Sequence, residues 1–398
     1  MNEKTDRVAE LQAAMAGNGI EAVVLRLAEN VVLVTEWYVQ IPGLGIAVVP
    51  REGPASLLVP EYEADEAAAV WGGDIRTFPA IRNDGPTPGE RIHALLEGLA
   101  AEHGSTGGTV GFEGSFETLA PASLAGEPNA VGLPTQALIR ETFGTERLVD
   151  VTETLEAMRA VKTERDLEKL RTVNEVAIIG LNAFKEHAVP GKSEVEIMAA
   201  VEAAVCAQGH GHDGARVVRA YATVYSGPDL ANGWQYFRSR TRVVEPDDVA
   251  MIEMGTVADG YWADHTRTVV AGRAGSRQRE AYEAIRAGAS AAFAAAVPGA
   301  TGGAVDRASR DVIAQAGFTQ FPHHTGHGVG FRYHESRPQL VPGGEHVLAE
   351  RMVIVTEPGI YDARLRGGFR HEDNAVVTPS GAVPLATTDY ALDLEGGP

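Results

Sequence analysis

The stretch MIEMGTVADGYWADHTRTVV, residues 251–270, decides how this sequence is interpreted. Two strand-like runs flank VADG, whose Asp259 and Gly260 are residues that tight turns favour. We therefore predict a β-hairpin. Symmetry about a four-residue loop places Glu253 opposite Asp264, and directly opposed side chains have Cβ atoms about 4.5–5.5 Å apart.

Two carboxylates at that distance repel each other, so one of them holds a proton unless a cation lies between them. The alternative for this segment alone is a slipped register that leaves one or both acids in water.

Composition and charge exclude several classes of protein. The chain has 398 residues, which favours two or three domains. A net charge of −20 argues against a nucleic acid or an anionic membrane as partner. The single cysteine, Cys206, allows no internal disulfide. The charged N-terminal segment MNEKTDRVAELQ has no apolar signal-peptide core, and no run reaches the roughly 18 apolar residues of a membrane span. We expect a soluble, cytoplasmic protein.

The chain divides into two parts of different character, which we place at residues 1–158 and 159–398. In the first part, helical spacing at residues 7–20 and 89–104 alternates with short aliphatic strands at 21–27, 45–50 and 55–60, which predicts a small α/β domain. The second part begins with long helical periodicity, in which Ser193 starts a second helix. Strands and hairpins follow, interrupted by helical blocks at 276–299 and 301–317, so this part is predicted to be α+β.

A second acid-bearing hairpin is predicted downstream. The strands MVIVTEPGIY (352–361) and GGFRHEDNAVVT (367–378) are joined by DARLRGG, and Glu357 and Glu372 are symmetric about that loop. Acids on strands are usually solvated, but two such hairpins in one region weaken that explanation.

Four of the twelve histidines cluster in FPHHTGHGVGFRYHESRP, residues 321–338. Gly326 and Gly328 flank His327, and glycine allows a close approach of the backbone. Four carboxylates and one imidazole form an oxygen-rich set that suits Mn²⁺, Fe²⁺, Co²⁺ or Zn²⁺. Two ions about 3.5–4 Å apart would balance the charge and activate a shared water. We interpret the separate GHGHDG segment, with His210 and His212, as a surface turn.

These motifs resemble those of the pita-bread metallopeptidases, which include methionine aminopeptidase, aminopeptidase P and prolidase, with creatinase as a relative. YWADHTRT is similar to the family's Asp-x-Thr-Arg-Thr strand, and HHTGHGVGFRYHESRP to its histidine segment. The two glutamate strands match as well, and MRAVKTERDLEKLR resembles the helix that opens the catalytic domain of prolidase-like members. The resemblance covers most of the chain and implies a pita-bread α+β catalytic domain after a smaller α/β domain.

The resemblance also implies roles for individual residues. Two divalent metal ions, most often Mn²⁺, with Co²⁺, Fe²⁺ or Zn²⁺ as alternatives, would be held by Glu253, Asp264, His327, Glu357 and Glu372. Asp264 and Glu372 would bridge them, and Glu357 would also shuttle a proton. His323 and His334 would steady the substrate carbonyl and the oxyanion, and Arg370 matches the arginine beside the last ligand.

This sequence departs from the family pattern at two places. The first ligand is an aspartate in the peptidases, whereas here it is Glu253, whose carboxylate is displaced by about one carbon–carbon bond length. We therefore expect one metal site to be weak or empty. Proline-specific members carry a histidine upstream, where this chain has Tyr236, with Trp234 nearby; both aromatics are candidate substrate-binding residues or core residues.

The resemblance implies an Xaa-Pro dipeptidase or aminopeptidase, expected to be a homodimer. One alternative is the same fold retuned for a small non-peptide substrate, as in a creatinase- or ectoine-hydrolase-like enzyme or a sulfonium lyase. Another is a non-catalytic binding protein, although such relatives usually lose metal ligands, which this chain keeps.

Overall fold

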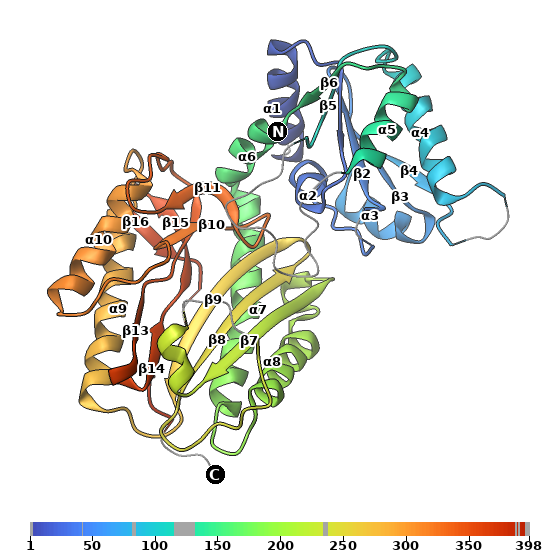
Figure 1. Cartoon of the computed structure of the whole chain (residues 1–398). Helices are drawn as coiled ribbons and strands as arrows, with labels where there is room; N and C mark the ends of the chain where they lie inside the picture. Colours follow the sequence, from blue (N-terminus) through green and yellow to red (C-terminus); the bar gives the residue numbers. More distant parts are fainter. Residues whose placement is uncertain are drawn as a thin grey trace. The chain divides into compact units, whose positions relative to one another are not determined.

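The computed structural model describes residues 3–41, 43–81, 85–114, 132–233, 238–386, 388 and 391–394 (Figure 1). The chain divides into two compact units, Met1–Arg159 and Ala160–Pro398. No helix in the described part of the chain combines the length and the low polarity that crossing a membrane requires.

Unit one is built on a six-stranded mixed sheet in the order β4-β3-β2-β1-β5-β6. The pair β1–β5 is parallel, whereas β1–β2 is antiparallel. The strands are β1 (Ala22–Leu25), β2 (Ile46–Pro50), β3 (Ser56–Pro60), β4 (Asp74–Phe78), β5 (Val110–Phe112) and β6 (Leu148–Asp150). The helices are α1 (Glu3–Gly17), α2 (Ala28–Thr35), α3 (Ala64–Val70), α4 (Pro88–Glu102), α5 (Leu133–Phe143) and α6 (Thr152–Ala160), with a 3₁₀ turn η1 (Glu61–Glu63). The predicted α/β character is confirmed.

Unit two begins with two long helices that pack on a three-stranded antiparallel sheet. Each helix starts at a capping box, formed by Thr163 with Asp166 and by Ser193 with Glu196. The helices are α7 (Glu164–His187) and α8 (Glu194–Gly209), and the strands are β7 (Val218–Ser226), β8 (Val249–Ala258) and β9 (Tyr261–Val270). Short 3₁₀ turns are η2 (His212–Gly214), η3 (Pro228–Asn232) and η4 (Ala363–Leu365).

The second half of unit two has a five-stranded sheet, β11-β10-β12-β15-β16, and the hairpin β13–β14. Its strands are β10 (Gly326–Gly328), β11 (Glu335–Leu340), β12 (Val353–Thr356), β13 (Gly359–Asp362), β14 (Gly367–Arg370), β15 (Asp373–Thr378) and β16 (Gly381–Pro384). The helices α9 (Ser276–Ala295) and α10 (Gly302–Gln315) pack on this half, as Figure 1 shows. A bridge between Thr266 and Glu372 joins the two halves. Unit two therefore has the predicted α+β arrangement.

The register of the β8–β9 hairpin differs from the predicted one. Glu253 lies opposite Thr266, and Asp264 lies opposite Gly255. The turn contains only Asp259 and Gly260, both with positive φ (49° and 86°), whereas the prediction assumed four loop residues. Glu253 and Asp264 are therefore diagonal neighbours. They still share one face of the sheet. Asp264 is two residues from Thr266, the partner of Glu253, and side chains two residues apart on a strand point to the same face.

The register of the second hairpin is confirmed. Thr356 pairs with Asp373 in one ladder, and Gly359 pairs with Arg370 in the next. Glu357 and Glu372 lie in the gap between these ladders at matching positions. Both acids therefore lie where strand pairing is interrupted, at the seam between the two halves of unit two.

Candidate metal centre

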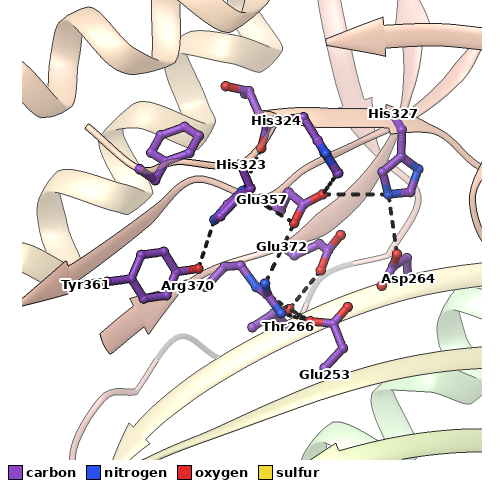
Figure 2. Close-up of polar contacts among 12 residues, drawn as sticks. Glu253, Asp264, Thr266, His323, His324, His327, Glu357, Tyr361, Arg370 and Glu372 are labelled. Carbon is purple, nitrogen blue, oxygen red and sulfur yellow. Dashed lines mark hydrogen bonds and ion pairs between the residues drawn. The ribbon is translucent and has the colours of Figure 1, made fainter. Parts of the chain in front are cut away.

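Acids and histidines from four separate stretches of unit two converge at this seam. Among the described residues, three sets of potential ligand atoms lie here, and within each set the atoms are no more than 4.8 Å apart. One set is Asp264, His327 and His334. We call another set the carboxylate side: Glu253, Asp264 and Glu372. We call the third set the histidine side: His324, His327 and Glu357. Figure 2 shows Asp264, His327 and Glu357 pointing toward a common centre.

The Asp-x-Thr-Arg-Thr strand orders the carboxylate side. The Thr266 hydroxyl lies 2.8 Å from carboxylate oxygens of both Glu253 and Glu372. Arg267 donates to the carbonyl oxygen of Glu372 at 2.7 Å. The Thr268 hydroxyl bonds the backbone of Arg370. This strand therefore fixes both the second hairpin and the acids that it carries.

The backbone of Asp264 is fixed from β15. The Asn374 side chain accepts a hydrogen bond from the Asp264 N–H at 3.1 Å and donates to its carbonyl at 2.6 Å. These two hydrogen bonds hold the Asp264 backbone, and its carboxylate is directed into the centre. Asn374 is thus a positioning residue that the sequence pattern alone did not single out.

The histidine segment is held by close backbone packing. A Cβ atom on Gly326 would lie 2.0 Å from the Val355 oxygen, and one on Gly328 would lie 2.1 Å from the Arg337 oxygen. Only glycine therefore fits on either side of His327, as predicted. Arg310 of α10 donates to the carbonyl oxygen of His323 at 2.6 Å. This bond fixes the loop that leads from α10 to His327.

The orientation of His327 suits the predicted role of a metal ligand. Its Nδ1 lies 2.8 Å from the carbonyl oxygen of Gly328, so Nδ1 carries the hydrogen and donates. Nε2 is then an acceptor, 3.5 Å from Asp264 Oδ2 and 3.7 Å from Glu357 Oε1. A backbone partner of this kind is the usual way in which proteins fix a ligating imidazole.

The residues present fit a divalent cation. Both carboxylate oxygens of Asp264, Nε2 of His327 and Oε1 of Glu372 are buried and make no hydrogen bond within the described residues. Burial raises the pKa of Asp264 to about 6, and burial with the nearby carboxylates raises the pKa of Glu372 well above its ordinary value. Buried, unpaired acceptors of this kind are costly unless a cation satisfies them.

Glu253 is committed to other partners. Arg370 forms an ion pair with its Oε2, and the Thr266 hydroxyl contacts the same oxygen. The Tyr333 hydroxyl donates to Oε1 at 2.7 Å. The extra methylene thus brings this carboxylate to three protein groups, which compete with a metal for its lone pairs. This arrangement supports the expectation that one metal site is weak, which stays a prediction.

His323 and His334 lie at the edge of the centre. His323 Nδ1 lies 2.7 Å from the His324 carbonyl, and its Nε2 lies 2.9 Å from the Tyr361 hydroxyl. His334 Nε2 lies 3.2 Å from Asp264 Oδ2, and its ring stacks on Tyr333 at 4.4 Å. Burial lowers the pKa of both histidines, to about 3 for His334, which favours the neutral form of each ring.

Sequence reasoning assigned no role to His324 or Tyr333, although both contact the predicted ligands. His324 Nε2 lies 2.6 Å from Glu357 Oε1. Trp234 and Tyr236, the predicted substrate-binding aromatics, lie outside the described residues. The GHGHDG segment ends in the turn η2 (His212–Gly214), where His212 pairs with the exposed Glu175 at 3.0 Å. Glu175, His212 and Asp213 have ligand-like spacing, but both acids are exposed.

The stabilisation that a metal gives is expected to increase with pH. The pKa of Asp264 is raised to about 6 in the folded, metal-free chain, and the pKa of Glu372 is raised well above its ordinary value. The stability that Asp264 contributes is therefore present at low pH and lost as pH rises through about 6, and the raised pKa of Glu372 acts in the same direction. A bound cation removes the cost of burying these ionised carboxylates. A metal ion present at 100 times its Kd adds about 2.7 kcal/mol to the free energy of unfolding. Melting temperatures of metal-loaded and chelator-treated protein, compared at about pH 5 and about pH 7.5, test this.

The matched control for this pH series is Asp264→Asn. In this variant the metal-induced rise in melting temperature should depend less on pH. A metal-induced rise in melting temperature that is equal or larger at the acid pH would contradict the expectation.

Comparison with known proteins assigns the chain to a class. Residues 168–379 match metallopeptidase family M24, and residues 7–161 match the creatinase/prolidase N-terminal domain. The chain belongs to metallopeptidase family M24, which confirms the resemblance and the pita-bread fold predicted from the sequence.

Relatives named as dipeptidases are similar over part or all of the chain. A probable dipeptidase PepE of Mycobacterium tuberculosis is 36% identical over 244 residues, which cover 61% of this chain and 62% of that protein. An Xaa-Pro dipeptidase of Pyrococcus horikoshii is 28% identical over 397 residues, covering 98% of this chain and 99% of that protein. The crystal structure of the prolidase from Pyrococcus horikoshii OT3 superposes with a TM-score of 0.76 at 26% identity, covering 97% of this chain and 99% of that one.

Proposed function

We propose that this chain is a metal-dependent Xaa-Pro dipeptidase, which hydrolyses the peptide bond before proline. One observation carries the proposal: Asp264, His327 and Glu372 present to one centre buried ligand atoms that make no hydrogen bond within the described residues, in a fold shared with a prolidase. The Xaa-Pro dipeptidase that is similar over almost the whole chain supports the choice of substrate.

The proposed ligands are Glu253, Asp264, His327, Glu357 and Glu372, and the proposed ions are divalent, with Mn²⁺ first. When bound, such ions activate water and polarise the substrate carbonyl. We propose residues 159–398 as the catalytic domain and residues 1–158 as the N-terminal domain. Homodimer formation is a further proposal from the family resemblance, and sedimentation of the purified chain tests it. A cytoplasmic location is a further proposal from the sequence, which has a single cysteine.

Glu357 is the proposed proton carrier. In the metal-free chain burial opposes its ionised form, but the adjacent His324 imidazole lowers its pKa to about 2, so Glu357 is ionised at neutral pH and able to accept a proton. It would take a proton from the attacking water and give it to the leaving proline nitrogen. His323 and His334, as neutral rings beside it, would orient the substrate carbonyl, and Arg370 keeps the neighbouring carboxylates in place.

A panel of dipeptides tests this function. Ala-Pro and Gly-Pro should be cleaved, whereas Ala-Ala and Pro-Ala should be cleaved far more slowly, because only the former place proline at the leaving nitrogen. Cleavage of all four at similar rates would contradict the proline preference. Bound metal without cleavage of any of them would favour the second candidate.

The second candidate is a hydrolase or lyase that acts on a small non-peptide substrate in the same centre. The contacts of Glu253 with Arg370, Thr266 and Tyr333 favour it, because they change the centre at the point where it departs from the peptidase pattern. Amide, amidine and sulfonium compounds are the substrates to add to the panel.

Shortening Glu253 is expected to strengthen metal binding on the carboxylate side. In Glu253→Asp the carboxylate no longer reaches the Tyr333 hydroxyl, so its lone pairs become available to an ion. We expect the second ion to bind about 10-fold tighter or more, the range associated with changes beside metal ligands. Titration calorimetry with Mn²⁺ and metal analysis per chain measure this.

Glu253→Gln is the matched control, since it keeps the length but removes the charge. It should weaken the same site. Equal metal content and affinity in the wild type and in Glu253→Asp would show that the length of this side chain does not limit binding.

A further inference from the structure

His324 has a placement to which the proposed function gives no role in metal binding. Its side chain is 28% exposed, but its Nε2 is buried and makes no hydrogen bond of normal geometry within the described residues. That nitrogen lies 2.6 Å from Glu357 Oε1 (Figure 2). The ring is thus directed into the centre rather than to solvent.

The position of this nitrogen matches that of a ligand. His324, His327 and Glu357 each offer one atom, and the three atoms lie within 4.8 Å of one another. Two atoms on opposite sides of one ion are about 4.2 Å apart when each bond is about 2.1 Å. The spacing of the three atoms is within or close to this value, so a small inward movement of the partly exposed His324 ring would bring all three onto one ion.

The surrounding groups favour coordination over a simple ion pair. An ion pair with Glu357 requires a protonated ring, but a divalent cation held beside His327 would repel that charge. A neutral His324 keeps its lone pair for the ion. The loop that carries it is fixed, because Arg310 donates to the adjacent His323 carbonyl and the Thr325 hydroxyl donates to Asp306 at 2.7 Å.

We propose that His324 is an additional metal ligand on the histidine side, so that one ion receives two imidazole nitrogens. The inference rests on the proposed metal centre. It has a chemical consequence, since imidazole suits Zn²⁺, Co²⁺ and Fe²⁺, whereas carboxylate oxygen suits Mn²⁺. The histidine side is therefore the tighter site and discriminates in favour of the nitrogen-preferring ions, while Glu253 weakens the carboxylate side.

The first readout counts nitrogen ligands. The full chain is loaded with less than one equivalent of Mn²⁺, so that the tighter site is occupied, and pulsed electron paramagnetic resonance measures couplings to ¹⁴N. The wild type should show two coordinated imidazoles, and His324→Gln should show one. The exposed His210→Gln is the matched control and should be identical to the wild type.

The second readout is selectivity, measured by competition with a chelator. His324→Gln should bind Zn²⁺ at least 10–100-fold less tightly, roughly the range for changes next to a ligand, with a smaller loss for Mn²⁺. His324→Asn serves as a second variant, and circular dichroism of each metal-free variant confirms folding.

The outcomes separate this inference from the proposed function. One coordinated nitrogen in both the wild type and His324→Gln, with an unchanged Zn²⁺ to Mn²⁺ preference, overturns the ligand role, and the peptidase proposal stands if the dipeptide panel succeeds. Two nitrogens in a wild type that cleaves no dipeptide supports the ligand role and contradicts only the peptidase proposal. A wild type that binds no ion overturns both.

Discussion

Replacement of Glu357 by glutamine is expected to lower kcat for Gly-Pro by about 10²–10⁴-fold, the usual contribution of a positioned acid–base group. Glutamine keeps the size of the side chain but cannot accept the proton. It also removes the charge that His324 and His327 approach at 2.6 and 3.7 Å. Steady-state kinetics at saturating metal separates the loss in kcat from a change in KM.

Glu350→Gln is the matched control for this variant, because it removes a carboxylate from an exposed position seven residues earlier. It should retain wild-type kinetics. A Glu357→Gln enzyme with kcat within a few-fold of the wild type would exclude proton transfer by Glu357. Unchanged biological activity despite lost hydrolysis would instead support a binding role for the protein.

The largest expected effect on stability comes from Lys162→Met. Lys162 Nζ lies 2.8 Å from Glu335 Oε2, and the two side chains are 0% and 3% exposed. Removal of one partner from a buried ion pair leaves an uncompensated charge and costs about 3–5 kcal/mol. Glu335 Oε1 also accepts the Phe331 N–H at 2.7 Å, so the loss should loosen the loop that carries Tyr333 and His334.

The double variant Lys162→Met/Glu335→Gln is the control for the ion pair, because it leaves no unpaired charge. It should be more stable than Lys162→Met alone. Urea titration gives the overall change, and hydrogen exchange at residues 329–335 reports local opening. A single variant as stable as the wild type, with unchanged exchange, would show that the pair does not hold this loop.

Much of the fold was predictable because local sequence and packing agree. The aliphatic strands at 45–50 and 55–60 are buried along their length, and the helix start at Ser193 is a capping box. The hairpin register was wrong at β8–β9, since symmetry about VADG cannot distinguish a four-residue loop from a two-residue turn. The same reasoning succeeded at Glu357 and Glu372, where the two ladders share one register.

The positions of the candidate ligands were predictable from ordered motifs, but their partners were not. Tyr333 lies 80 residues from Glu253 in the sequence, and their hydrogen bond depends on the packing of two hairpins. The Arg370–Glu253 ion pair and the hydrogen bonds between Asn374 and Asp264 likewise join distant segments. His324 was visible as one of four clustered histidines, but its direction depends on backbone geometry that the sequence does not encode locally.

The most direct test of a metal-dependent peptidase is the metal content of the purified chain, measured together with Gly-Pro hydrolysis before chelation, after chelation and after divalent metal is restored. We predict at least one tightly bound ion per chain, loss of hydrolysis on its removal, and recovery when Mn²⁺, Co²⁺ or Zn²⁺ is added. Undiminished hydrolysis by protein shown to be free of metal would contradict the central claim.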